Sequence, residues 1–144
     1  MTDKRPHQTL LDKEALLAAP EEEYMNIAQR AYFKQVLVDL YDATQAHIED
    51  AKQQMKQPHD SSDANDLASW QEQSNFALRI VDREQKLLPK IKEALARIRL
   101  ETYGYCEESG EPIGIGRLLA RPTAIFGSDV KLLKEIEEES YRKP

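Results

Sequence analysis

Cysteine is nearly absent from this sequence: among 144 residues there is one, Cys106. A single thiol cannot form an intrachain disulfide, and this scarcity is typical of proteins in a reducing compartment, so a cytoplasmic location is expected. The sequence also lacks the ~18 consecutive apolar residues that a membrane span requires, and it lacks a basic-then-apolar secretory leader. No contact with a membrane is therefore predicted.

Positive charge and catalytic motifs are also scarce. The 26 acidic residues outnumber 20 Lys and Arg, and the formal net charge of −6 disfavours nonspecific binding to a phosphate backbone. There is no Gly-rich phosphate loop and no Ser or Cys nucleophile with a His placed by a motif. The three histidines, at positions 7, 47 and 59, are scattered. These absences predict a protein that is not an enzyme.

Two long helical segments occupy residues 21–101, where glycine is absent and proline is rare. In the first segment Phe33, Val36, Leu40 and Ala43 recur at 3-4-3 spacing, which lines one side of a helix. The second segment has a coiled-coil seam with steps of four and three and two polar interruptions. This seam consists of Trp70, Ser74, Ala77, Val81, Glu84, Leu88, Ile91, Leu95 and Ile98. A short polar turn separates the segments, so they are expected to form an antiparallel hairpin.

The predicted fold is mainly α, with a long antiparallel coiled-coil hairpin, a small zinc-ribbon-like and metal-free globular base, and a C-terminal helix. Residues 1–20 form an N-terminal segment with a short helix. Residues 21–101 form the hairpin, whose tip lies near 57–66. Residues 102–127 form the zinc-ribbon-like module, and residues 128–144 form the last helix.

Pro89 lies inside the second helical segment. Proline removes one backbone hydrogen bond and crowds the preceding turn, so a kink is expected between Gln85 and Pro89. The seam continues on both sides, which favours one bent helix over two separate elements.

The module has tight turns and short apolar runs like a zinc ribbon, which requires two C-x2-C pairs. Starting from Cys106, that spacing places the other three ligand positions at Ser109, Gly127 and Val130. These residues predict a metal-free module without zinc, although nearby acidic residues could form a weak metal site. Apolar side chains are then expected to pack on one another and on the last helix: Ile113, Ile115, Leu118, Leu119, Ile125 and Phe126.

Acidic residues crowd the predicted tip, where Asp60, Asp63 and Asp66 lie close together without Lys or Arg. Two interpretations stand side by side: the carboxylates cap a helix and keep a loop soluble, or they probe a deep basic or metal-containing cavity of a partner. A series of basic residues is either a solvated face or a surface for an anionic ligand or acidic partner. It comprises Arg83, Lys86, Lys90, Lys92, Arg97, Arg99, Arg117, Arg121 and Lys131.

Several stretches resemble the DksA/TraR family of bacterial RNA polymerase regulators, over nearly the whole chain past residue 20. They are "EEEYMNIAQRAYF", "DANDLAS", "DREQKLLPKIKEAL", "YGYCEESGEPIGIGRLLARPTA" and "DVKLLKEI". The resemblance implies insertion of the hairpin into the polymerase secondary channel, with three residues near the polymerase active site: Asp63, Asp66 and Ala68. It implies polymerase contacts by Arg83 and Arg117.

The same resemblance implies a site for guanosine tetraphosphate (ppGpp) at the polymerase interface. The matching residues are Leu87, Lys90, Arg121 and Lys131. The expected function is regulation of initiation in the stringent response with ppGpp and without zinc, inhibiting ribosomal RNA-type promoters and activating others. The protein is expected to act as a monomer and to read no DNA sequence. Two alternatives remain: a Gre-type transcript-cleavage factor, and a structural coiled-coil adaptor.

Overall fold

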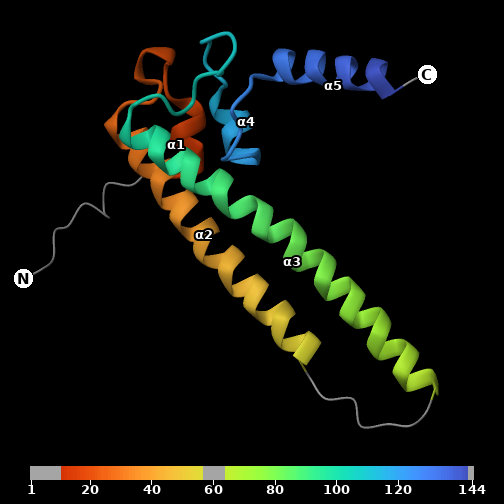
Figure 1. Cartoon of the computed structure of the whole chain (residues 1–144). Helices are drawn as coiled ribbons and strands as arrows, with labels where there is room; N and C mark the ends of the chain where they lie inside the picture. The colour runs from red at the N-terminus through yellow and green to blue at the C-terminus, as the bar shows by residue number, and fades with distance from the viewer. Residues whose placement is uncertain (1–10, 57–63, 143–144) are drawn as a thin grey trace, which may run out of the picture. The chain divides into compact units, whose positions relative to one another are not determined.

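The computed structural model describes residues 11–56 and 64–142, with side chains described as far as Glu139 (Figure 1). Its elements in chain order are α1 (Lys13–Ala18), a 3-10 turn η2 (Glu21–Glu23), α2 (Ile27–Lys56), α3 (Ala64–Arg99), α4 (Ile115–Ala120) and α5 (Ser128–Arg142). Within the described ranges there is no strand, only an isolated bridge between Tyr105 and Pro112. The prediction of a mainly helical protein is confirmed. None of the helices in these ranges is both long and apolar enough to cross a membrane.

The chain divides into two compact units. The hairpin unit is Val38–Glu93, and the base unit combines Met1–Leu37 with Ala94–Pro144. Helices α2 and α3 contribute residues to both units. Each unit is described by itself below.

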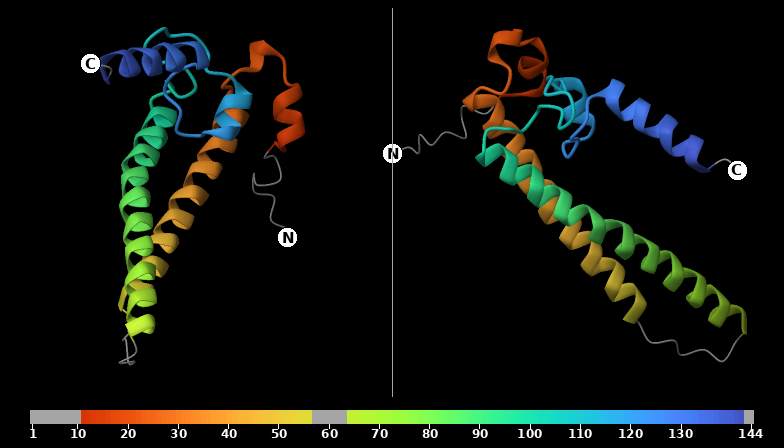
Figure 2. Two further views of the ribbon diagram at one scale, coloured as in Figure 1. Left: turned by 90° about the vertical axis from the view of Figure 1, so that its right-hand side faces the viewer. Right: turned by 45° about the horizontal axis from the view of Figure 1, so that its top comes forward.

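Helices α2 and α3 run antiparallel in the hairpin unit, as the views in Figure 2 show. Lys92 Nζ lies 5.8 Å from the ring centroid of Tyr41, and His47 Nδ1 lies 2.8 Å from Glu84 Oε1. The partner numbers fall along α3 as they rise along α2, which is the order of an antiparallel pair. Apolar side chains fill the space between the helices: Ile48, Ala51, Ala77 and Val81, with Met55, Ile80 and Leu88 against them. The predicted hairpin is confirmed.

The buried stripe on α2 differs from the predicted one. Val36 is only half-buried and Ala43 is exposed, whereas the buried side chains of α2 are Gln29, Phe33, Leu37, Thr44, Ile48 and Ala51. Thr44 can take a seam position because its hydroxyl donates a hydrogen bond to the Leu40 carbonyl over 2.7 Å. A polar residue whose hydrogen bond is made inside its own helix can be buried at little cost. The 3-4-3 prediction is therefore wrong for Ala43, while Val36 and Leu40 are half-buried at the edge of the stripe.

Helix α3 passes through Pro89 without interruption, so the prediction of one element over both halves of the seam is confirmed. Proline cannot donate to the carbonyl four residues earlier, which is that of Gln85. Pro89 is exposed. The freed Gln85 carbonyl therefore lies on the side of the helix where water can reach it.

The start of α2 is fixed by a reciprocal pair of hydrogen bonds. The Gln29 backbone N–H donates to Asn26 Oδ1 over 2.9 Å, and the Met25 backbone N–H donates to Gln29 Oε1 over 2.8 Å. This arrangement resembles a capping box, in which two free amides at a helix start are satisfied together. Met25 has a φ of 55°, which is uncommon for a residue with a side chain. The buried Gln29 amide holds this turn in place.

Aromatic rings form the centre of the base unit. The ring of Tyr103 packs against Phe33 with centroids 5.6 Å apart, and that of Tyr105 packs edge-on against Tyr24 at 5.5 Å. The Tyr103 hydroxyl donates to the Pro122 carbonyl over 2.7 Å. These contacts join the start of α2 to the segment that follows α3. Helix α1 packs on α4 in the same unit.

Helix α5 does not bury its apolar side chains as expected. Leu132 is 56% exposed, Leu133 59% and Ile136 51%. The expectation that the module's apolar residues pack on this helix is therefore wrong for these three positions. The first turn of α5 also approaches the module, because Ser128, Asp129 and Val130 help to line a pocket there.

Candidate functional site

Acidic and small residues mark the first turns of α3 in the hairpin unit. Asp66 lies in the first turn and is exposed, and Ala68 is exposed one half-turn later. A carboxylate is favoured at this end of a helix by the helix dipole and the free backbone amides. Asp60 and Asp63 lie outside the described residues, so their grouping with Asp66 stays a prediction.

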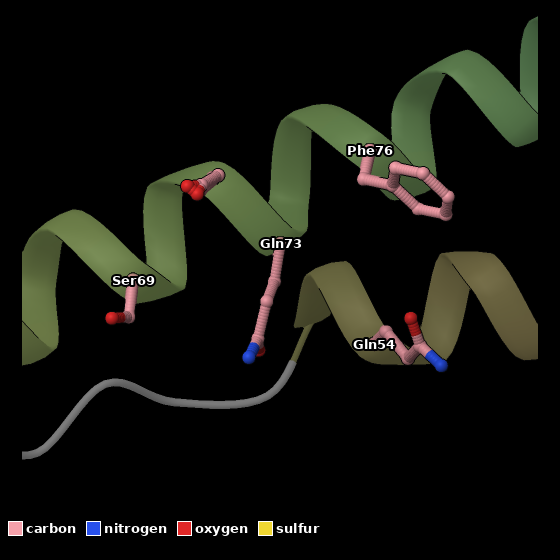
Figure 3. A pocket seen from close by; sticks show the side chains of 5 residues that line it. Gln54, Ser69, Gln73 and Phe76 are labelled. Carbon is pink, nitrogen blue, oxygen red and sulfur yellow. The ribbon is translucent and has the colours of Figure 1, made fainter.

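A shallow pocket of about 380 Å³ lies between α2 and α3 near the same end of the hairpin unit. Figure 3 shows Ser69, Gln73 and Phe76 of α3 on the side that faces Gln54 of α2. Glu72 completes the lining. The Phe76 side chain is 61% exposed, which is unusual for a large aromatic residue in a helix pair. Sequence analysis missed this pocket, although Phe76 could have been noticed because it lies off the seam.

Basic residues follow one face of α3. Arg83, Leu87 and Lys90 are spaced by four and three residues, so the helix brings them onto one face. Arg83 and Lys90 are exposed, while Leu87 is half-buried. Arg79 continues this face one turn earlier and is also exposed. It was missed because the resemblance pointed only to Arg83, but its spacing of four would have revealed it.

The predicted basic residues of the base unit have different surroundings. Arg117 Nε donates to the Phe126 carbonyl over 2.9 Å, so this guanidinium holds the chain before α5. Arg121 follows α4 directly and is exposed. Lys131 is half-buried, and its Nζ lies 3.9 Å from Glu135 Oε1 on the same helix. Since Leu87 and Lys90 belong to the other unit, the convergence of the four ppGpp residues stays a prediction.

Lys134 joins α5 to the module and was not singled out from the sequence. Its Nζ lies 3.0 Å from Glu108 Oε2 and 4.8 Å from the ring centroid of Phe126. The Glu108 carboxylate accepts a hydrogen bond from Lys134 and attracts its charge, and both effects raise the pKa of the Lys134 ammonium. No simple periodicity reveals such a contact, because Glu108 lies in a turn far away along the chain.

The four positions that match the zinc-ribbon spacing lie close together in the structure. Cys106, Ser109, Gly127 and Val130 line one pocket of about 420 Å³. Cys106 is 3% exposed. Burial raises the pKa of its thiol, but hydrogen bonds from the Ser109 hydroxyl and from the amides of Gly127, Ser109 and Glu108 lower it to about 7. The Ser109 amide nitrogen is 3.5 Å from the Cys106 sulfur.

Two family models match adjacent parts of the chain. Residues 29–98 match the model described as "DnaK suppressor protein DksA, N-terminal domain". Residues 101–126 match the model described as "Prokaryotic dksA/traR C4-type zinc finger". Together they cover nearly all of both long helices and of the module.

The second match corrects the prediction that the protein has no zinc cofactor, because the module belongs to a class of zinc finger. The four positions of this chain do not reproduce a four-thiolate set. Only Cys106 carries a thiol, and Gly127 and Val130 have no donor atom in their side chains. Among residues 11–56 and 64–142, no group of three or more His, Cys, Asp or Glu could hold a metal ion. No functional step is therefore derived through a metal.

Known relatives cover most of the chain. Proteins of Salmonella typhimurium and Escherichia coli K12, both named RNA polymerase-binding transcription factor DksA, are 41% identical over 127 residues, 83% of this chain and 80% of theirs. A protein of the same name from Caulobacter vibrioides is 37% identical over 134 residues, 92% of this chain and 94% of its own. The solved structure of transcription factor DksA2 from Pseudomonas aeruginosa is similar with a TM-score of 0.76 and 41% identity, covering 89% of this chain and 99% of that one. The predicted resemblance is confirmed, and the chain belongs to the DksA/TraR family.

Proposed function

We propose that this protein binds bacterial RNA polymerase and regulates the initiation of transcription, with its hairpin in the secondary channel. It acts with ppGpp in the stringent response, inhibits ribosomal RNA-type promoters and activates others. It works in the cytoplasm as a monomer, reads no DNA sequence and catalyses no reaction of its own. The name shared by its relatives in three genera, RNA polymerase-binding transcription factor DksA, supports the polymerase as the partner.

The observation that carries this proposal is the exposed Asp66 carboxylate in the first turn of a 36-residue helix. At 1.5 Å per residue a helix of that length spans roughly 54 Å. A helix of this kind can carry a carboxylate deep into a narrow opening of a much larger partner. Asp66 and Ala68, with Asp63, are the residues proposed to act near the polymerase active site.

Basic residues supply the proposed contacts with the polymerase and with ppGpp. Arg83 on α3 is proposed to contact the polymerase. Arg117 shares this role through its terminal guanidinium nitrogens, because its Nε is already bonded to Phe126. The phosphates of ppGpp favour Lys and Arg through charge-assisted hydrogen bonds. The proposed ppGpp residues are Leu87, Lys90, Arg121 and Lys131.

Substitution of Asp66 by Asn tests the proposal, because it removes the charge and keeps the size of the side chain. The variant is expected to bind polymerase with unchanged affinity and to lose inhibition of a ribosomal RNA promoter in vitro. Asp42→Asn is the matched control, since Asp42 is exposed in the middle of α2 and should keep full activity. Binding is measured by competition with a labelled wild-type protein, and inhibition by transcript yield with and without ppGpp.

The same assays separate the proposed function from its alternatives. Stimulated cleavage of RNA in backtracked complexes would identify a Gre-type factor and contradict the proposal. A structural adaptor would tolerate Asp66→Asn in every assay. An effect of Asp66→Asn equal to that of Asp42→Asn would therefore contradict the proposed role of the carboxylate.

A further inference from the structure

Beyond its first turn, helix α5 contacts the rest of the base unit through a cation, Lys134. Leu132, Leu133 and Ile136 are each more than half exposed. Among the side chains described in α5, Lys134 is the one with an ion pair or ring contact to the module. This residue therefore bears strongly on the direction of the helix beyond its first turn.

The residues that receive Lys134 are themselves held in place. The ring under its Nζ belongs to Phe126, whose carbonyl accepts the 2.9 Å hydrogen bond from Arg117 of α4. The residue before Glu108 is fixed twice, since Glu107 pairs with Arg97 at 3.2 Å and its amide donates to the Ile125 carbonyl over 2.8 Å. Lys134 thus binds a supported surface formed by two separate segments of the base unit.

Lys131 lies three residues before Lys134 on the same helix. Residues three apart in a helix are neighbours on its surface, so the anchor at Lys134 also limits where the Lys131 ammonium can be. The partner of Lys131 on its own helix, Glu135, lies at 3.9 Å, which is the outer limit of an ion pair, so this pairing leaves Lys131 available to another anion.

We propose that Lys134 is a positioning residue: its contacts with Glu108 and Phe126 hold α5 so that Lys131 is placed for the phosphates of ppGpp. This inference rests on the proposed function, because it takes Lys131 as a ppGpp ligand. Lys134 does not itself touch ppGpp. Its contribution is to order the helix before the ligand binds, which lowers the ordering cost at the moment of binding.

The test substitutes Lys134 by Gln, which removes the cation and keeps a long polar side chain. The concentration of ppGpp that gives half of its full effect on a ribosomal RNA promoter is expected to rise about threefold to tenfold, the range for one ordered side chain. Affinity for polymerase in the absence of ppGpp should stay unchanged. Amide hydrogen exchange in α5 should become faster, because the helix loses its anchor.

Three further variants give the controls. Lys134→Arg keeps a cation that can pair with Glu108 and stack on Phe126, so this variant should respond to ppGpp at the same concentrations as the wild type. Glu108→Gln removes the acceptor charge and should shift the ppGpp response in the same direction as Lys134→Gln. Glu139→Gln is the control for Glu108→Gln, because it also removes one negative charge, at an exposed position of α5. It should not change the ppGpp response.

The outcomes distinguish this inference from the function on which it rests. A wild-type protein that responds to ppGpp, with Lys134→Gln responding at the same concentrations, overturns the inference alone. A loss of polymerase affinity without ppGpp in Lys134→Gln also overturns it, because Lys134 would then contact the polymerase directly. A wild-type protein that binds polymerase but never responds to ppGpp overturns both the ppGpp part of the proposed function and the inference.

Discussion

The Tyr24 hydroxyl links three segments of the base unit, and removing it should measurably destabilise the protein. It donates to the Gly104 carbonyl over 2.6 Å and accepts a hydrogen bond from the Gly114 amide over 2.9 Å. In Tyr24→Phe the ring remains and can keep its edge-on contact with Tyr105. The substitution therefore isolates the two hydrogen bonds.

The expected loss of stability depends on which hydrogen bonds the Gly104 carbonyl and the Gly114 amide keep in the variant. The Gly104 carbonyl keeps a second hydrogen bond, from the Ile113 amide at 2.8 Å, so its share is about 1 kcal/mol. The Gly114 amide loses the partner seen in the structure, and leaving such a half-buried group unpaired costs ~1–3 kcal/mol. Tyr24→Phe should thus lower the free energy of unfolding by about 2–4 kcal/mol.

Urea denaturation monitored by circular dichroism gives this quantity, and hydrogen exchange at the Gly114 amide reports the local loss. Tyr32→Phe is the matched control, because its ring packs edge-on against Phe33 in the same unit and no hydrogen bond of its hydroxyl is seen in the described residues. It should cost less than about 0.5 kcal/mol, the range for surface substitutions. Equal effects of the two substitutions would refute the reasoning.

The Tyr24 contribution also has a predicted pH dependence. Burial raises the pKa of the Tyr24 hydroxyl above its ordinary value of 10.0, while the hydrogen bond from Gly114 opposes this shift. A group whose pKa is raised by folding stabilises the protein fully below its unfolded pKa. The stability difference between wild type and Tyr24→Phe should therefore be constant up to about pH 10, the unfolded pKa of tyrosine, and shrink as the pH rises through the folded pKa.

Three other predictions concern single positions. Pro89→Ala restores a helix amide at an exposed site of α3 and should stabilise the protein by about 1–3 kcal/mol in urea denaturation. An unchanged or lower stability would contradict the cost assigned to a proline inside this helix. Gly104→Ala should cost at least 1 kcal/mol more than Gly110→Ala, although both glycines have positive φ, because a Cβ at Gly104 would lie 2.9 Å from Met25 Cγ. In the folded protein the ultraviolet absorbance of the Cys106 thiolate should titrate with a midpoint near pH 7, and this signal should be absent from Cys106→Ser. A midpoint at the ordinary pKa of a thiol would contradict the hydrogen bonds described for its sulfur.

The antiparallel helix pair could be predicted because its signal is strong in α3. Ala77, Val81 and Ile91 are buried as their spacing of four and three implies. The seam of α2 could not be read in the same way, because it includes the polar Thr44, whose hydroxyl is satisfied by the Leu40 carbonyl. Glu84 is tolerated in the α3 seam because His47 reaches it from α2 at 2.8 Å. A hydrophobicity pattern does not reveal either of these two polar interactions.

The base unit was less predictable because its contacts join residues that are far apart in the sequence. The spacing from Cys106 identified four positions by the zinc-ribbon template, and the structure places all four around one pocket. The attachment of α5 was wrongly assigned to apolar packing, since the pair of Lys134 and Glu108 joins a helix to a turn without any local pattern. The exposed Phe76 and the pocket beside it likewise depend on how two helices meet.

Photo-crosslinking from the start of α3 tests the central claim most directly. A photoreactive amino acid replaces the exposed Ala68, and the purified protein is irradiated with RNA polymerase, with Ala43 in the middle of α2 as a second exposed site. The account predicts crosslinks from position 68 to peptides that line the polymerase active site, suppressed by excess unlabelled protein, and crosslinks from position 43 to other peptides. Crosslinks from position 68 that map only to the outer surface of the polymerase would contradict the account.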